Sequence, residues 1–108
     1  MYTVYALVDP RDYCTRYIGV TNDVYRRFQE HLRTDTCADP KVAWIRELKS
    51  TQMMVLMKTL EQVSDLEEAR TRETYWIQHY CFQNAPLFNV VTPEDRITIK
   101  KAKGAGRK

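Results

Sequence analysis

The residue that points most directly to chemistry is Glu73, a carboxylate within an apolar pattern. In a helix predicted over Asp65–Tyr80, at ~100° per residue, Glu73 falls near the middle of the apolar arc. That arc consists of Leu66, Ala69, Trp76, Ile77 and Tyr80. Ionised carboxylates are rarely buried unless they pair with a cation or bind a metal. Periodicity therefore leaves two interpretations open: a metal ligand, or an ion pair with Arg70 or another cation at the edge of the core.

A second group of polar side chains occurs on a helix predicted over Asp23–Arg33. Its apolar face is predicted to consist of Val24, Tyr25, Phe28 and Leu32. Arg27 and His31 are four residues apart and share the flank of that face. A guanidinium binds phosphate in bidentate fashion, so the two side chains could converge on one anion. The alternative is a surface helix on which the stem of Arg27 packs over Phe28.

Tyrosines, a glycine and an asparagine complete the candidate set. Tyr5 lies in the middle of one predicted strand, and Tyr17 precedes Ile18-Gly19 in the next. A strand tyrosine usually packs in a core or against a neighbouring strand. Gly19 inside a strand often marks the close approach of backbone or ligand. Asn89 lies in an apolar run, where its amide needs partners, so it either ties down a loop or faces a site.

The elements that position these residues follow from local patterns. Two strands form a hairpin, two helices follow, and a third strand precedes the Glu73 helix. The predicted ranges are Tyr2–Val8, Thr15–Val20, Asp23–Arg33 with Asn22 or Thr21 as cap, Asp39-Pro40 to Lys49, Met53–Leu60, and Asp65–Tyr80 after the capping box Ser64-Asp65-Leu66-Glu67. A short extended segment (Leu87–Val91) and a weak helix from Thr92-Pro93-Glu94-Asp95 come last. The order β-β-α-α-β-α predicts an α+β fold: a small three-stranded antiparallel sheet flanked by helices. The continuous apolarity of Met53–Leu60 favours a central strand.

Composition limits the class of protein. The chain has 108 residues, 44% of them apolar, which fits one globular domain. The longest apolar run, Met53–Met57, is too short to span a membrane, and the start lacks a signal-peptide pattern. Cys14, Cys37 and Cys81 form no CxxC pair, so we expect reduced thiols and a cytoplasmic location.

Charge divides the chain into two parts. Residues 96–108 carry a charge of +6 and residues 1–95 carry −3. We therefore expect a domain over 1–95 and a basic, flexible tail over 96–108, which either contacts phosphates or only solubilises the end of the chain. The sequence contains no Ser-His-Asp arrangement, phosphate-binding glycine loop or HExxH motif.

In this order, the polar residues resemble the signature of the GIY-YIG nuclease family. The first element is degenerate, Thr3-Val4-Tyr5, and the second is intact, Tyr17-Ile18-Gly19. The arginine that the family carries on the following helix corresponds to Arg27, and its frequent histidine corresponds to His31. The family's metal-binding glutamate corresponds to Glu73, in Arg72-Glu73-Thr74-Tyr75-Trp76-Ile77, and its late asparagine corresponds to Asn89. The resemblance covers residues 2–91. Thr3 and Val4 replace the first Gly and Ile, and Val20 stands where some relatives place a lysine.

The resemblance implies a metal-dependent endonuclease that hydrolyses DNA phosphodiester bonds at a single-metal site. It implies that Glu73 is the sole protein ligand of Mg²⁺ or Mn²⁺, that Arg27 binds the scissile phosphate and that Asn89 positions the site. Alternatives are an inactive nucleic-acid-binding module of the same fold and an unrelated protein-interaction domain with a basic tail. The sequence has no helix-turn-helix or zinc finger that would read DNA bases. We therefore expect the specificity for DNA to be low, to depend on DNA structure, or to be supplied by a protein partner or a C-terminal extension. The protein is expected to be a monomer or a dimer.

The resemblance also implies that Tyr5, with Tyr17 or His31, orients or deprotonates the attacking water. It favours Tyr5 as the base. An unperturbed tyrosine has a pKa near ~10 and an unperturbed histidine one near ~6.5. On pKa alone His31 is the easier base, and it remains the rival of Tyr5.

Overall fold

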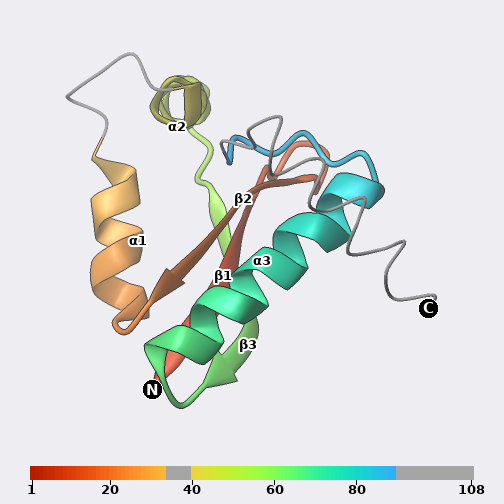
Figure 1. Ribbon diagram of the computed structural model, residues 1–108. Helices are drawn as coiled ribbons and strands as arrows, with labels where there is room; N and C mark the ends of the chain where they lie inside the picture. The colour runs from red at the N-terminus through yellow and green to blue at the C-terminus, as the bar shows by residue number, and fades with distance from the viewer. Residues whose placement is uncertain (34–39, 90–108) are drawn as a thin grey trace.

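The computed structural model describes residues 1–33 and 40–89 and confirms the predicted order of elements (Figure 1). The elements are β1 (Tyr2–Val8), β2 (Thr15–Thr21), α1 (Val24–Leu32), α2 (Pro40–Ser50), β3 (Leu56–Val63) and α3 (Leu66–Phe82). The fold is α+β, with one three-stranded antiparallel sheet and three helices in these ranges. The hairpin prediction is correct to within one residue.

The strand order is β2-β1-β3, so the central strand is β1. The expectation that the apolar segment Met53–Leu60 forms a central strand is wrong. The strand begins at Leu56 and lies at the sheet edge, while Met53 and Met54 precede it and are exposed. An apolar run does not by itself reveal how many neighbours a strand has. The burial of each strand in the structure agrees with the strand order, since Thr3–Val8 of the central strand β1 are all buried.

Alternating side chains of β1 divide the core between the two faces of the sheet. Tyr5 and Leu7 join the cluster that includes Trp44, Ile45 and Leu48 of α2. Val4 and Ala6 face the opposite way, and Trp76, Ile77 and Tyr80 of α3 pack against their cluster. Figure 1 shows α3 running across one face of the sheet.

The helix α1 differs from its predicted orientation. Tyr25 was expected on the inner face, but it is 75% exposed, and Val24 is also exposed. Phe28 and Leu32 do pack against the core. His31, which was expected on the flank of this face, is itself buried. The second half of this short helix supplies the core contacts. Its buried face is therefore rotated toward His31 relative to the predicted apolar face.

The caps of α1 and α3 are each shifted by one or two residues from the predicted positions. Asp23 caps α1 by accepting the backbone N–H of Arg26 at 3.0 Å, in place of the expected Asn22 or Thr21. Asp65, not Ser64, caps α3 by accepting the N–H of Glu68 at 2.7 Å. In each case an aspartate carboxylate satisfies an N–H that the first helical turn leaves unpaired.

A buried carboxylate, Asp9, joins α2 to the turn between β1 and β2. Asp9 is fully buried and accepts the indole N–H of Trp44 at 2.8 Å. It also accepts Nη2 of Arg11 at 2.8 Å, and Nη2 of Arg16 lies 3.3 Å away. The hydrogen bonds from Arg11 hold the pKa of Asp9 well below its usual range, against the effect of burial. The predicted hairpin implies a turn here, but the sequence did not predict this contact.

Several expectations fall wholly or partly outside the described ranges. These are Cys37, the cap of α2 at Asp39, the end of the segment Leu87–Val91, the last weak helix and the tail 96–108. Leu87–Asn89 is described and is not a strand, although the N–H of Phe88 donates to the carbonyl of Arg16 at 2.6 Å. Cys14 and Cys81 are free thiols. No helix within residues 1–33 and 40–89 is long and apolar enough to cross a membrane.

Candidate active site

The centre of the site is Tyr5, whose buried hydroxyl contacts two polar side chains of α1. Its oxygen lies 2.8 Å from Nε2 of His31 and accepts the Nε–H of Arg27 at 3.3 Å. Tyr5 pairs with Gly19 across the β1–β2 ladder, and its ring lies over the glycine. A Cβ at Gly19 would lie 2.5 Å from Cζ and 2.8 Å from Cε2 of Tyr5. Gly19 therefore provides the space that the ring occupies.

Tyr17 and His31 complete a group of three rings around Tyr5. The ring centroids of Tyr5 and Tyr17 are 6.4 Å apart, and that of His31 is 5.7 Å from Tyr5 and 5.6 Å from Tyr17. Tyr17 is half-buried, and Nζ of Lys41 lies 4.6 Å from its ring centroid, a cation–π contact. Three separate elements, β1, β2 and α1, thus bring one ring each to the same place.

Burial determines the protonation of the hydrogen-bonded pair. It raises the pKa of Tyr5 to about 12, although the hydrogen bond from Arg27 acts in the opposite direction. It lowers the pKa of His31 to about 3, helped by the positive charges of Lys41 and Arg27. Both side chains are therefore neutral at pH 7. Because Arg27 donates to the phenol oxygen, the hydroxyl proton is free to point at Nε2 of His31.

Arg27 is held between Tyr5 and an acidic neighbour on its own helix. Its Nη1 donates to Oε1 of Glu30 at 2.9 Å, while Arg26 donates to the other oxygen of Glu30 at 3.1 Å. The hydrogen bond from Arg27 lowers the pKa of Glu30. Arg27 is 34% exposed and Arg26 is 56% exposed, so Arg27 is the one that faces the ring group. The sequence singled out Arg27 but not its partner Glu30.

Glu73 lies on α3 and is partly buried. Its side chain is 20% exposed, and Oε1 accepts Nη1 of Arg70 at 3.3 Å. The ion pair that the sequence left open as one interpretation is thus present. The negative charge of Glu73 also contributes to the raised pKa of Tyr5, so the carboxylate lies within electrostatic reach of the phenol.

The donor set around Glu73 fits a hard cation that keeps most of its water ligands. Across residues 1–33 and 40–89, no three His, Cys, Asp or Glu side chains gather into a metal-binding group. A structural zinc site of four protein ligands is therefore not formed by these residues. A single, largely buried carboxylate is an ordinary protein contribution to Mg²⁺ binding, in which waters and substrate oxygens supply the remaining ligands.

Asn89 ties the end of the described chain to the strand that carries Tyr17. Its Oδ1 accepts the N–H of Ile18 and its Nδ2 donates to the carbonyl of Ile18, both at 2.8 Å. The amide thus pairs with the free edge of β2 between Tyr17 and Gly19. The sequence left two interpretations of Asn89 open: it fixes a loop, or it faces a site. In the structure its amide hydrogen bonds fix the loop to β2.

The structure therefore brings Tyr5, Tyr17, Arg27 and His31 into one group. Glu73 lies within electrostatic reach of Tyr5, and Asn89 lies at the free edge of β2. Sequence reasoning missed Lys41, which reaches Tyr17 from a different helix. No local pattern marks such a contact, because it depends on how α2 packs against the sheet.

Comparison with protein families gives an independent assignment. Residues 1–84 match the GIY-YIG catalytic domain. Comparisons with curated proteins and with solved structures returned no match. A GIY-YIG catalytic domain implies nuclease-type hydrolysis of phosphodiester bonds in a nucleic acid, and nucleases of this kind generally use a divalent metal. Asn89 lies beyond the matched residues, whereas the other five candidate residues lie within them. The chain belongs to the GIY-YIG catalytic domain family.

Proposed function

We propose that the protein is a metal-dependent endonuclease that hydrolyses DNA phosphodiester bonds by attack of an activated water. The observation that carries the proposal is the position of the Tyr5 hydroxyl, between Nε2 of His31 and Nε of Arg27. A phenol held by a hydrogen-bond acceptor on one side and a guanidinium on the other is suited to orient and activate a water beside a bound phosphate.

Arg27 would bind the scissile phosphate. Two of its N–H groups are used by Tyr5 and Glu30, and a guanidinium has further donors for phosphate oxygens. Its charge would oppose the negative charge that develops on the phosphate in the transition state, a role typically worth several kcal/mol. Glu30 would hold the guanidinium in orientation.

Tyr5 would take the proton of the attacking water as a phenolate, which would require positive charge at the site to lower its pKa from about 12. His31, with a pKa of about 3, is too weak a base to hold that proton and serves as the hydrogen-bond acceptor that orients the phenol. His31 is 4% exposed and its Nε2 faces Tyr5, so a water would reach the phenol rather than the imidazole. The phenol is itself 1% exposed and is covered in part by Arg27. A small shift of Arg27, as its remaining donors bind the phosphate, would therefore be needed for the water to reach the hydroxyl, which ties substrate binding to access.

Glu73 would hold Mg²⁺ or Mn²⁺. When bound, such an ion stabilises charge on the phosphate and on the leaving 3′ oxygen. Tyr17 would position the water beside Tyr5, and Asn89 would hold β2 in register without taking part in the reaction. The tail 96–108, with its six basic residues, would add sequence-independent contacts to DNA phosphates.

Incubation with supercoiled plasmid, with and without Mg²⁺, tests the proposal. We expect Mg²⁺-dependent nicking or linearisation by the wild type and loss of cleavage in Glu73→Gln, with folding unchanged by circular dichroism. Glu68→Gln, an exposed substitution on the same helix, is the matched control and should cut normally. A folded Glu73→Gln protein that cuts at the wild-type rate would contradict the metal role. DNA binding without cleavage by the wild type would identify an inactive binding module instead.

A further inference from the structure

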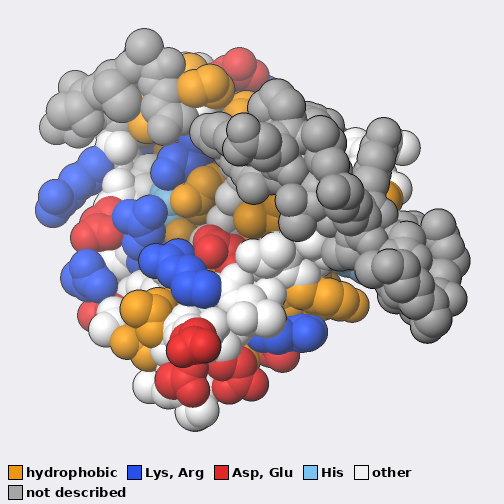
Figure 2. All heavy atoms as spheres, in the orientation of Figure 1, with side chains coloured by type: hydrophobic (Ala, Val, Ile, Leu, Met, Phe, Trp, Pro, Cys, Tyr) orange, Lys and Arg blue, Asp and Glu red, His pale blue; other side chains and the backbone are white. Residues whose placement is uncertain are grey.

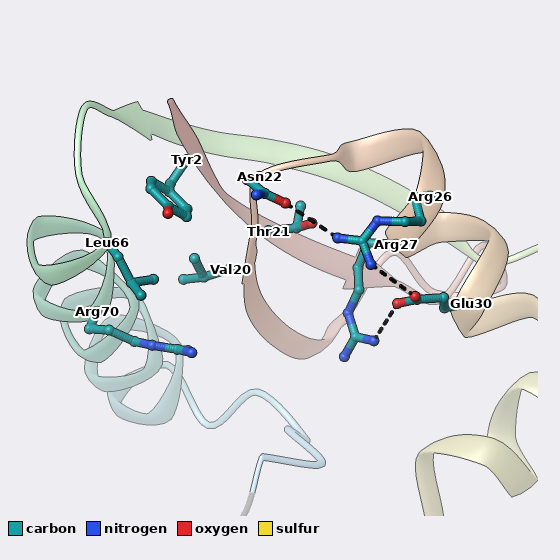
Figure 3. A pocket seen from close by; sticks show the side chains of 9 residues that line it. All are labelled: Tyr2, Val20, Thr21, Asn22, Arg26, Arg27, Glu30, Leu66 and Arg70. Atoms are coloured by element: carbon teal, nitrogen blue, oxygen red, sulfur yellow. Dashed lines mark hydrogen bonds and ion pairs between the residues drawn. The ribbon is translucent and has the colours of Figure 1, made fainter.

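A basic pocket lies between α1 and α3, next to the ring group, and shares Arg27 with the candidate site. Its volume is about 310 Å³, and its lining includes Tyr2, Arg26, Arg27, Leu66 and Arg70. Figure 3 shows the guanidinium groups of Arg27 and Arg70 extending toward the same space from the two helices. On the surface, basic side chains gather over α1 and continue toward α3 (Figure 2).

The charge of this pocket suits an anion. Three guanidinium groups line it, against one carboxylate, Glu30. Arg26 and Arg70 are 56% and 62% exposed, so their charges face solvent and cost little to keep there. The mechanism proposed above uses only Arg27 of the three, which leaves Arg26 and Arg70 without a role in the reaction.

We propose that this pocket binds a second phosphate of the substrate strand, next to the scissile one, through Arg26 and Arg70. The inference rests on the proposed nuclease function and adds a substrate subsite to it. The lining also includes the ring of Tyr2 and the side chain of Leu66, which give the sugar or base attached to that phosphate a partly apolar surface. A nucleic acid strand has both chemistries, whereas free inorganic phosphate has only the charge.

Arg70 connects the subsite to the metal site, because it also pairs with Glu73 at 3.3 Å. A divalent cation on Glu73 and the Arg70 guanidinium compete for the same carboxylate. A metal held by Glu73 would therefore release Arg70 to the second phosphate, and a phosphate that draws Arg70 away would leave Glu73 open to the cation. Since coupling between two ligands is reciprocal, each should raise the affinity of the other.

The first test measures DNA binding without cleavage, by fluorescence anisotropy of a labelled duplex in EDTA at several salt concentrations. Arg26→Gln and Arg70→Gln should each weaken binding about three- to tenfold and lower the salt slope by about one. Lys58→Gln on β3 is the control: it removes the same charge from an exposed position outside the pocket and should change little. Inorganic phosphate should compete with DNA only at concentrations far above those of a competing oligonucleotide. Equal losses in Arg70→Gln and Lys58→Gln would overturn the subsite.

The second test measures binding of Mn²⁺ alone, by the paramagnetic resonance signal of the free ion. Arg70→Gln should tighten Mn²⁺ binding several-fold, because it removes the competing cation from Glu73, whereas Arg26→Gln should leave it unchanged. An unchanged Mn²⁺ affinity in Arg70→Gln would overturn the exchange. These outcomes are distinguishable from that of the plasmid assay. A Glu73→Gln protein that still cuts would refute the catalytic proposal. The effects of Arg26 and Arg70 on DNA affinity are measured without cleavage and test the subsite separately.

Discussion

The hydroxyl oxygen of Tyr5 lies 2.8 Å from Nε2 of His31, although the two residues are 26 positions apart in the chain. The contact changes how the two candidates for the general base relate to each other. The sequence presents them as rivals, but in the structure they form one hydrogen-bonded pair in which only the phenol faces Arg27. We therefore treat Tyr5 as the group that meets the water and His31 as the hydrogen-bond acceptor that orients the phenol.

Replacing Tyr5 by Phe tests this assignment. Phenylalanine keeps the ring over Gly19 and removes only the hydroxyl, so the folded protein should persist. The single-turnover cleavage rate should fall about 10²-fold or more if the phenol transfers the proton. His31→Gln should also slow the reaction, and the wild-type rate should show no ionisation near pH 6.5, because the pKa of His31 is about 3. A wild-type single-turnover rate in Tyr5→Phe would leave Tyr5 with a packing role only.

Arg27 and Arg26 are neighbours with different surroundings, and the pair provides an internal control. At saturating DNA, Arg27→Ala should reduce the single-turnover rate by orders of magnitude, because the side chain is proposed to meet charge in the transition state. Arg26→Ala should weaken DNA binding but leave the saturated rate within a few-fold of wild type. Equal losses of rate from the two substitutions would indicate a general basic patch in place of a site.

The features that could be predicted from sequence are those that local patterns fix. Strand composition and helix periodicity placed β1, β2 and α3 closely, and the odd position of Glu73 within the α3 stripe identified a functional candidate. The exposed Met53 and Met54 misled the prediction of β3, because a short apolar run does not distinguish a buried strand from the segment that leads into an edge strand. Capping fell on Asp23 and Asp65, each next to a residue that could also cap.

Long-range relationships could not be predicted in this way. Trp44 reaches Asp9 across 35 positions, and Lys41 reaches Tyr17 only because α2 packs on that face of the sheet. The burial of His31 was also missed, since a histidine on the flank of a helix becomes a core residue only after the helix rotates onto its neighbours. Such contacts depend on packing between elements, which periodicity within one element does not specify.

Gly19→Ala should disturb both stability and catalysis. The added methyl would lie well within van der Waals contact of the Tyr5 ring, so the ring or β2 must shift. Overpacking of this kind costs about 1–3 kcal/mol, which chemical denaturation would measure as a lower free energy of unfolding. Cleavage should slow as the hydroxyl leaves its position beside His31. In a Tyr5→Ala background the same substitution should cost much less, and an equal cost in both backgrounds would show that the ring is not the obstacle.

Acid should destabilise the protein in a pH range that His31 determines. The pKa of His31 is about 3 in the folded protein, against an ordinary value near 6.5 in the unfolded chain. As pH falls below 6.5 the unfolded chain therefore takes up a proton that the buried imidazole does not, and the free energy of unfolding decreases until pH approaches the folded pKa. Between pH 7 and pH 5 this amounts to about 2 kcal/mol for a fully developed shift.

Urea unfolding at pH 7, 6 and 5 of the wild type and of His31→Gln measures that contribution. Glutamine does not ionise, so the variant should lose less stability over this interval, by up to ~2 kcal/mol. Asp9 provides a separate signal at lower pH. Its pKa is held below the ordinary value of 3.8 by Arg11, so the stability it contributes is present above that pH and is lost as pH falls further. Asp9→Asn should therefore leave the pH 7–5 slope unchanged while lowering stability by about 2 kcal/mol throughout. Parallel slopes for the wild type and His31→Gln would mean that His31 is protonated in the folded protein near pH 6, which would contradict its role as a neutral acceptor for Tyr5.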